Sequence, residues 1–346
     1  MFKIKHSQMY KRHFLITILC FLLLQSIAAQ ELQRFTFQSY HMGTQFNIVL
    51  YSDDDSIASQ ASEEAFNRIE ELNQIMSDYE DDSELNRLSR TSGSGKAVKV
   101  SNDLFKVLKE SVRMAELSDG LFDITVGPMS RFWRMVRMSP DPQLPTEQEI
   151  AEFERQVGYE HIRLDEENQT AELTKPDMQL DLGGIAKGYA AEEALKVLKS
   201  FGIERALVDA GGDVTLGDPP SGRESWDVAV PKSQQNGESQ FITLQTANKT
   251  VTTSGDLFQF VEIDGTRYSH ILNPMTGLGA TNQIQATVIA DEGMKADALS
   301  SILTLMTPEE GIDLINETDQ TEAILFVNEG DTILEFYSNG AKDFIK

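Results

Sequence analysis

The chain has 346 residues, of which 40% are hydrophobic and 25% charged, and its formal net charge is −25 at pH 7. So large an acidic excess argues against nucleic-acid binding, because that affinity comes mainly from Lys and Arg side chains on phosphates. A solvated acidic surface explains most of these charges. Any phosphate-bearing ligand must therefore be held by backbone amides, a metal ion or a few well-placed cations.

The first thirty residues differ in composition from the rest of the chain. Four positively charged residues, the last of them Arg12, precede an apolar run from Phe14 to Leu24, and small residues follow at Ser26, Ala28 and Ala29. This order is typical of a secretory signal peptide. The alternative is a membrane anchor, although the run is shorter than the roughly 20 apolar residues that span a bilayer. We expect cleavage near Ala29 and an exported protein, periplasmic or otherwise extracytoplasmic.

Cys20, the only cysteine, lies inside this apolar run. Lipid attachment normally requires a small residue just before the cysteine, and Leu19 is not small, so a lipoprotein is disfavoured. A mature chain without the leader would contain no cysteine and could form no disulfide.

The first part of the mature chain mixes strands with helices. Alternating polarity predicts strands over Arg34–Ser39 and Gln45–Tyr51, and apolar residues at helical spacing predict an amphipathic helix over 56–76. A glycine- and serine-rich loop follows over 91–96. Ser101 then has the character of an N-cap, and Gly120 lies near the expected end of that helix.

The second part shows no internal repeat and no strict alternation of strand and helix. An irregular stretch over 140–145 precedes a short helix, and a further helix is predicted over 184–200. Strands are expected over 206–209, 226–230, 241–245, 258–263 and 285–290, then helices near Met294 and after Pro308, and strands over 323–327 and 332–336. This pattern favours an α+β fold. Without a long linker, we expect one compact unit over residues 31–346.

Three segments combine residues that could carry chemistry. LDLGGIAKGY, over 180–189, places Asp181 before two glycines and Lys187 in the first turn of the next helix. Paired glycines allow a backbone to approach a ligand closely, and a helix N-terminus favours anions. Taken alone, such a segment is more often a plain turn.

The other two segments are equally ambiguous singly. YSHILNPMTG, over 268–277, uses good turn residues to present His270, a possible proton acceptor. KADALSSI, over 295–302, places Asp297, Ser300 and Ser301 on one helical face, an arrangement suited to Mg²⁺ completed by substrate phosphates. A lone histidine is more often structural, and an aspartate in a first helical turn can be explained by the helix dipole.

Several shorter pieces are weaker still. They are MGT at 42–44, SDYEDDSELNRL at 77–88, GLFDITVGP at 120–128 and DAGGDV at 209–214. The acidic run from Asp78 to Glu84 would ordinarily be a solvated loop, and DAGGDV is most simply a strand, a turn and a strand. Tyr79 and Phe122 could be core residues or could flank a planar ring.

Together and in this order, the pieces resemble the FAD:protein FMN transferase (ApbE) family, over about Met42 to Thr307. The shared pattern also includes TSG at 253–255 and the A-D-A-L-S segment at 296–300. Two positions depart from it, since the family usually has aspartate at Asn273 and threonine at Ser301. Serine keeps the hydroxyl, so its role is carried over, whereas Asn273 receives no catalytic role.

The resemblance implies an enzyme that binds FAD and Mg²⁺ in the cleft of one α+β unit. His270 would be the general base. Flavin or adenosine contacts would come from Met42, Tyr79, Leu121, Phe122, Asp123, Asp181, Lys187 and Leu272. The metal ligands would be the Gly184 carbonyl, Asp297 and Ser301, with Ser300 close by.

The implied reaction moves FMN from FAD onto a threonine or serine hydroxyl of an acceptor flavoprotein and releases AMP. In the family the acceptor lies in an Asp…Ser/Thr-Gly-Ala-Thr motif of respiratory or exported flavoproteins, so a membrane-associated respiratory complex is a candidate partner. Leu278–Thr281 lacks the hydroxyl and upstream aspartate of that motif. Two alternatives remain: hydrolysis of FAD to FMN and AMP, and non-catalytic flavin binding.

Overall fold

The computed structural model describes residues 32–346, apart from 236–237, 258 and 331. The expected leader, residues 1–30, lies outside the described residues. Among those described, no helix is both long and apolar enough to cross a membrane.

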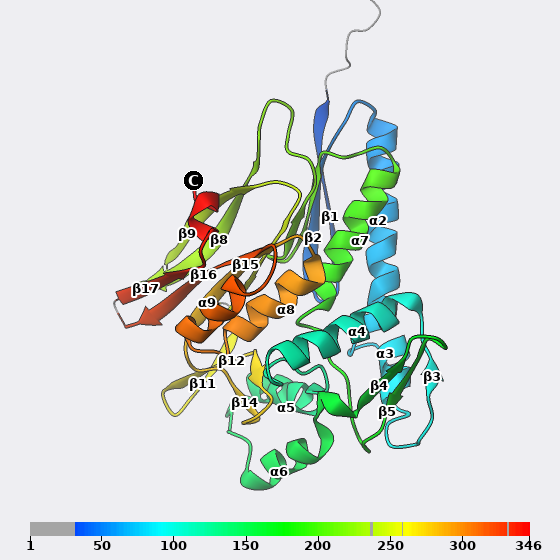
Figure 1. Cartoon of the computed structure of the whole chain (residues 1–346), viewed down its shortest axis with the longest axis vertical. Coiled ribbons are helices and arrows are strands. Elements are labelled where there is room, and N and C mark those ends of the chain that lie inside the picture. Colours follow the sequence, from blue (N-terminus) through cyan, green and yellow to red (C-terminus); the bar gives the residue numbers. More distant parts are fainter. Residues whose placement is uncertain (1–31, 236–237, 258, 331) are drawn as a thin grey trace, which may run out of the picture.

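An eight-stranded sheet forms the centre of the molecule (Figure 1). Its neighbouring strands all pair antiparallel. In spatial order the strands are β1 (Gln33–His41), β2 (Thr44–Ser52), β6 (Ala206–Ala210), β7 (Val214–Leu216), β10 (Thr250–Ser254), β15 (Ile284–Ala290), β16 (Thr321–Glu329) and β17 (Thr332–Tyr337).

Both faces of the sheet are covered, which explains why the central strands are apolar on both sides. Because side chains alternate along a strand, Ile48 and Leu50 pack in the main core while Val49 packs in a second core behind the sheet. The main core lies under α2 (Asp55–Met76), α7 (Ala186–Ser200) and α8 (Gly293–Leu303). The long hairpin of β8 (Trp226–Gln235) and β9 (Glu238–Thr246) covers the second core.

Two smaller assemblies complete the fold at one end of the large sheet (Figure 1). The first is a three-stranded sheet with two helices: β3 (Val98–Lys99), β4 (Ile162–Asp165), β5 (Thr170–Leu173), α3 (Glu84–Ser89) and α4 (Asn102–Leu117). The second packs two helices against two short hairpins: α5 (Gly127–Met138), α6 (Glu147–Gln156), β11 (Phe260–Ile263), β12 (Thr266–Ser269), β13 (Leu272–Asn273) and β14 (Leu278–Gly279). Helix α9 (Pro308–Asn316) and two 3-10 turns, Tyr159–His161 and Ala341–Phe344, are peripheral.

The α+β prediction is confirmed, and most predicted elements are present. Asp54 caps α2 through its side chain, and Ser101 caps α4 as expected. The helix predicted from Gly184 begins instead at Ala186, because 183–185 form a turn. Phe258, the expected start of one strand, lies outside the described residues, and the strand seen there begins at Phe260.

Two expectations for polar segments were wrong. The acidic run from Asp78 to Glu84 is not a solvated loop throughout: Glu84 begins α3 and accepts a hydrogen bond from the Ser101 backbone N–H at 2.6 Å. Helix α5 was not predicted, although its start carries Pro128, whose fixed φ suits the first turn of a helix.

Candidate functional site

The glycine turn before α7 brings three distant segments into contact. Asp181 closes the turn by accepting a hydrogen bond from the Gly183 N–H at 2.8 Å. A β-carbon placed on Gly184 would lie 3.3 Å from the Phe122 ring and 3.4 Å from the Ser301 hydroxyl oxygen. Gly184 therefore lies directly between the segment that follows α4 and helix α8, in a space that leaves little room for a side chain.

Helices α7 and α8 cross in backbone contact through a pair of glycines. A β-carbon on Gly188 would lie only 2.1 Å from the Gly293 carbonyl oxygen, so no larger residue fits without moving a helix. This approach lets the Gly188 N–H donate to Asp297 Oδ2 at 3.0 Å. Gly188, the third glycine of the segment GGIAKGY, thus has a packing reason that the sequence did not indicate.

Lys187 lies between two buried carboxylates. Its ammonium group forms an ion pair with Asp213 and lies 3.7 Å from Asp297 Oδ1. Burial alone would lower the pKa of Lys187, but the two carboxylates outweigh it and raise that pKa, so the lysine is charged. Asp297 is 2% exposed and Asp213 4% exposed. Asp213 had no predicted site role, and it lies in the turn between β6 and β7 that was expected on sequence grounds.

A group of three hydroxyls lies beside Asp297. Ser300 donates to the Asp297 carbonyl at 2.8 Å, and its oxygen lies 2.8 Å from that of Ser254. Ser301 lies 3.3 Å from the Ser254 hydroxyl and is less buried than Ser300. Since the single proton of Ser300 is used internally, Ser301 is the hydroxyl better placed to serve a ligand. Ser254, at the end of β10, is a further member that sequence reasoning did not identify.

His270 follows β12 and faces the same cluster. Its Nδ1 lies 3.2 Å from the carbonyl oxygen of Gln259, so this nitrogen carries the proton and Nε2 keeps a free lone pair. Burial, assisted by the positive charges of Arg137 and Lys187, lowers the pKa of His270 to about 4. The ring is therefore neutral near pH 7 and able to accept a proton.

Tyr79 is fixed from one side by an arginine on α5. The Arg134 guanidinium lies 3.9 Å from the centroid of the Tyr79 ring, and the tyrosine is still 69% exposed. Arg134 also forms an ion pair with Asp78 and lies 3.8 Å from Asp181 Oδ2. An exposed ring whose other face stays open can stack against a planar ligand.

Arg137, one helical turn after Arg134, is partly buried and close enough to Tyr79, Asp181 and His270 to affect them electrostatically. Within the described part of the chain its guanidinium has no hydrogen-bond or ion-pair partner. Because burial lowers the pKa of Arg137, it is a cation held at an energetic cost beside the predicted ligand residues.

The remaining predicted residues have supporting positions. Asp123 is buried, and its carboxylate accepts hydrogen bonds from the Thr125 N–H at 2.8 Å, the Thr125 hydroxyl at 2.6 Å and the Tyr159 N–H at 2.9 Å. It therefore fixes the loop that carries Leu121 and Phe122. Leu272 packs in the core under α5.

Met42 lies in the two-residue turn between β1 and β2, with a positive φ of 49°, and packs against the main core. The flavin contacts expected of Met42 and Leu121 stay a prediction.

These oxygens fit a small hard cation better than a soft one. The Gly184 backbone, the Asp297 carboxylate and the Ser301 hydroxyl meet where α7 and α8 cross, and carboxylate with neutral oxygens is the donor type that Mg²⁺ prefers. Among the described residues, no group of three or more His, Cys, Asp or Glu could hold a metal ion. A metal here would therefore rely on mixed protein oxygens and on its ligand.

An antiparallel sheet under two helices that cross at Gly188 and Gly293, with a buried lysine–aspartate cluster and a neutral histidine, is the arrangement of an α+β enzyme. Residues 42–325 match the ApbE family, and the chain belongs to that family.

The relatives named FAD:protein FMN transferase include one from Vibrio cholerae, 31% identical over 88% of this chain and 90% of its own length. Another, from Escherichia coli K12, is 27% identical over 88% and 87% of the two chains. The solved structure of the flavin transferase ApbE from Vibrio cholerae superposes with a TM-score of 0.81 at 29% identity, covering 90% of this chain and 99% of that one. The ApbE protein of Thermotoga maritima gives 0.79 at 28% identity, covering 91% and 100%. These comparisons confirm the expectation of an enzyme of the flavin transferase class.

Proposed function

We propose that this chain transfers FMN from FAD to a threonine or serine hydroxyl of an acceptor flavoprotein, in a Mg²⁺-dependent reaction that releases AMP. The observation that carries this proposal is the position of Lys187 beside the Asp297 carboxylate, with Ser301 against Gly184 and a neutral His270 whose pKa is lowered by burial and also by the nearby charge of Lys187. One surface of this kind can bind an anionic ligand and a divalent cation, and it also supplies a proton acceptor.

Each residue has a distinct part in the proposed reaction. Lys187 would compensate charge on the pyrophosphate of FAD, and Tyr79 and Phe122 would contact its rings. The Gly184 carbonyl, Asp297 and Ser301 would hold Mg²⁺, which when bound neutralises the pyrophosphate and stabilises the leaving phosphate. Asp123 and Asp181 would fix the loops that line the cleft.

The bonds and protons balance without any further reactant. The acceptor oxygen forms a bond to the FMN phosphorus, and the bond from that phosphorus to the bridging oxygen breaks. The bridging oxygen leaves with AMP. The hydroxyl proton passes to Nε2 of His270, the nitrogen left unprotonated because Nδ1 donates to Gln259.

The acceptor is a separate protein in this proposal. We infer a motif of the Asp…Ser/Thr-Gly-Ala-Thr type in an exported or respiratory flavoprotein, and we infer export of this chain with cleavage near Ala29. Among the residues of β14 and its neighbourhood, Leu278–Thr281 lacks the acceptor hydroxyl of that motif. The chain would therefore act as donor machinery.

The test is incubation with FAD, Mg²⁺ and a candidate acceptor, followed by intact mass of the acceptor. Transfer predicts a mass gain of one FMN less one water, together with AMP. Free FMN released without acceptor would favour hydrolysis, and tight FAD retention without turnover would favour simple flavin binding. His270→Ala should lower transfer by about 10²–10⁴ while FAD binding persists. Transfer within a few-fold of the parent would remove His270 as the base.

A further inference from the structure

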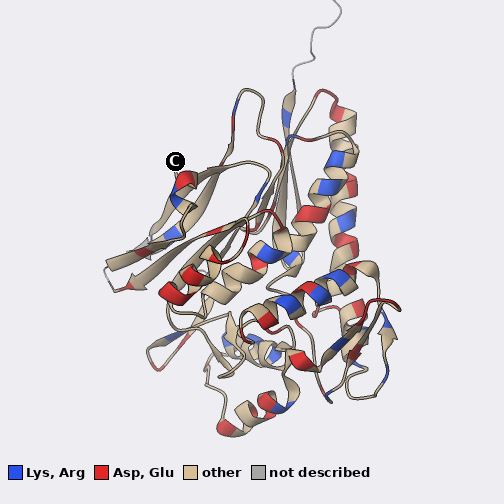
Figure 2. Ribbon diagram, viewed as in Figure 1, with Lys and Arg blue, Asp and Glu red and all other residues tan. Residues whose placement is uncertain are grey.

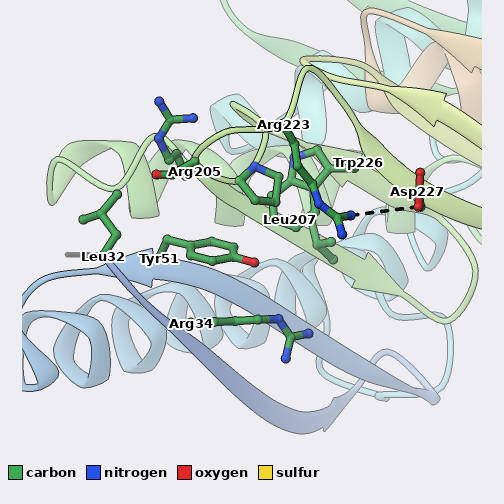
Figure 3. A pocket seen from close by; sticks show the side chains of 10 residues that line it. Leu32, Arg34, Tyr51, Arg205, Leu207, Arg223, Trp226 and Asp227 are labelled. Atoms are coloured by element: carbon green, nitrogen blue, oxygen red, sulfur yellow. Dashed lines mark ion pairs between the residues drawn. The ribbon is translucent and has the colours of Figure 1, made fainter.

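A hollow apart from the proposed flavin site lies at the start of strand β6 (Figure 3). Strand β6 connects the two: Arg205 and Leu207, at its start, line this hollow, whereas Asp213 follows its end. A five-residue strand is roughly 16 Å long, so the two sites are separate. The volume is about 1110 Å³, which can accommodate a ligand of cofactor size.

The lining of this hollow is cationic, in contrast to the chain as a whole. Three arginines, Arg34, Arg205 and Arg223, line it with one acidic residue, Asp227. The net charge of the chain is −25. Acidic residues are spread over many elements of the chain (Figure 2), so a local excess of guanidinium groups makes this hollow a place where an anion can be retained.

The arginines differ in how far they are already paired. Arg205 donates to the Pro219 carbonyl, and Arg223 lies 3.9 Å from Asp227, which also accepts from Lys346 at 2.8 Å. The Arg34 side chain, by contrast, has no hydrogen-bond or ion-pair partner within the residues that the structure describes. Figure 3 shows Arg34 on β1 and Arg223 on the loop above it, extending from opposite walls.

Aromatic and apolar side chains form the remaining wall. Tyr51 and Trp226 lie with their ring centroids 6.0 Å apart, and Leu207 and Pro220 adjoin them. The Trp226 indole N–H donates to the carbonyls of Gly217 and Asp218, at 3.2 and 3.1 Å, so the ring is fixed before any ligand arrives. This combination suits a ligand with one anionic end and one flat or apolar part.

We propose that this hollow is a binding site for a phosphate ester, held by Arg34 and Arg223 with its organic part on Tyr51 and Trp226. Two guanidinium groups from opposite walls can each bind different oxygens of one phosphate ester, which offers three terminal oxygens where a carboxylate offers two. The ligand can be a soluble phosphate ester or the headgroup of an anionic lipid. The site is independent of the proposed flavin transfer.

The chain contains two tryptophans, Trp133 and Trp226, and they report on opposite ends of the molecule. Trp133 is fully buried on α5, and its indole N–H donates to the Gly277 carbonyl at 2.8 Å. Protein labelled with 5-fluorotryptophan should therefore give two ¹⁹F resonances, assigned by the loss of one in Trp133→Phe. Titration with phenyl phosphate should shift the Trp226 resonance saturably and leave the Trp133 resonance in place.

Matched variants then locate the anion. Arg34→Gln and Arg223→Gln should each weaken phenyl phosphate binding about threefold to tenfold, and added salt should weaken it in the parent. Arg163→Gln, an exposed arginine on β4, removes the same charge elsewhere and should have no effect. Because these side chains are exposed, none of the variants should prevent folding.

A vesicle arm distinguishes the two sources of phosphate. Cosedimentation with phosphatidylglycerol vesicles, lost in Arg34→Gln and absent with phosphatidylcholine, identifies a lipid headgroup. A Trp226 shift with phenyl phosphate but no such cosedimentation identifies a soluble ester. An unmoved Trp226 resonance together with vesicle binding that is absent or independent of Arg34 would overturn the proposal. These readouts do not use transfer activity, so they stand apart from failure of the proposed function.

Discussion

Asp297→Asn and Asp213→Asn form a matched pair of perturbations. Both carboxylates are buried and both lie beside Lys187, at an ion-pair distance for Asp213 and at 3.7 Å for Asp297. Asp297 also lies one helical turn before Ser301 on α8, and its backbone carbonyl accepts a hydrogen bond from the Ser300 hydroxyl at 2.8 Å. The proposed metal site therefore predicts different consequences from the same chemical change.

The expected magnitudes follow from these contacts. Asparagine at 297 can still accept the Gly188 N–H hydrogen bond through its amide oxygen, and Lys187 keeps Asp213. The stability loss should thus be about 1–3 kcal/mol, below the 3–5 kcal/mol typical of an abandoned buried charge. In a chain of this size each kcal/mol lowers the Tm by about 2–4 °C.

The effect on metal demand should be larger than the effect on stability. A Mg²⁺ site that loses its only protein carboxylate should need about 100-fold more metal for half-maximal turnover, or more. Even the loss of a group that only hydrogen-bonds to a metal ligand typically lowers metal affinity or activity by about 10–100-fold. Asp213→Asn should instead weaken FAD binding through Lys187, with metal demand within about threefold of the parent.

The assay is FAD-dependent modification of an acceptor across a Mg²⁺ titration, with thermal unfolding of each variant measured in parallel. Asp297→Asn should retain a folded core and lose turnover at ordinary Mg²⁺. If both variants need the same Mg²⁺ concentration for half-maximal turnover, the assignment of Asp297 is refuted. A raised Mg²⁺ requirement in Asp213→Asn alone would instead place the metal at the turn between β6 and β7.

Three further predictions concern other parts of the site. If His270 is the base, its lowered pKa places the acid limb of the transfer rate near pH 4 rather than about 6.5. Because the folded pKa of His270 lies below its unfolded value, this residue also makes the free energy of unfolding fall as pH drops from about 6.5 toward 4. Profiles of transfer rate and of unfolding against pH, measured for the parent and H270A, separate the two effects. Gly188→Ala should destabilise the chain by about 1–3 kcal/mol or more, since its β-carbon would meet Gly293, and an unchanged denaturation midpoint would disprove that close approach. Arg137→Gln should raise the KM for FAD about tenfold while Arg131→Gln, on the exposed side of α5, should not; steady-state kinetics of both variants decide this.

The central elements could be predicted because burial there leaves a periodic pattern in the sequence. Helix α2 presents Ala61, Ile69 and Leu72 to the core at helical spacing, and β1 and β2 alternate in polarity. Lys187 and Asp297 were candidates from their own segments, but only the resemblance assigned both to one site, since their spacing in the sequence says nothing of the glycine contact that joins α7 to α8.

The parts that sequence reasoning missed depend on long-range contacts. Asp78 belongs to an acidic run, and nothing local distinguishes it from solvated neighbours until Arg134 comes from α5 to pair with it. Helix α5 itself begins with the Gly-Pro pair that ends the segment GLFDITVGP, which was interpreted as a ligand-binding stretch, so Arg134 and Arg137 had no expected position. Recognition of Pro128 as a first-turn proline would have identified the helix.

The charge of the site explains how so acidic a chain can bind a pyrophosphate. Lys187 is charged and lies beside Asp213 and Asp297, and burial together with the charge of Asp297 raises the pKa of Asp213 to about 7, so near neutral pH the cluster presents no excess positive charge to FAD. In the proposed mechanism a divalent cation held by Asp297 would add positive charge there, and Arg137, which has no hydrogen-bond or ion-pair partner among the described residues, adds to it from α5. The same carboxylates that keep Lys187 charged in a buried place would then make pyrophosphate binding conditional on the metal. Binding of either ligand must then strengthen binding of the other by the same factor.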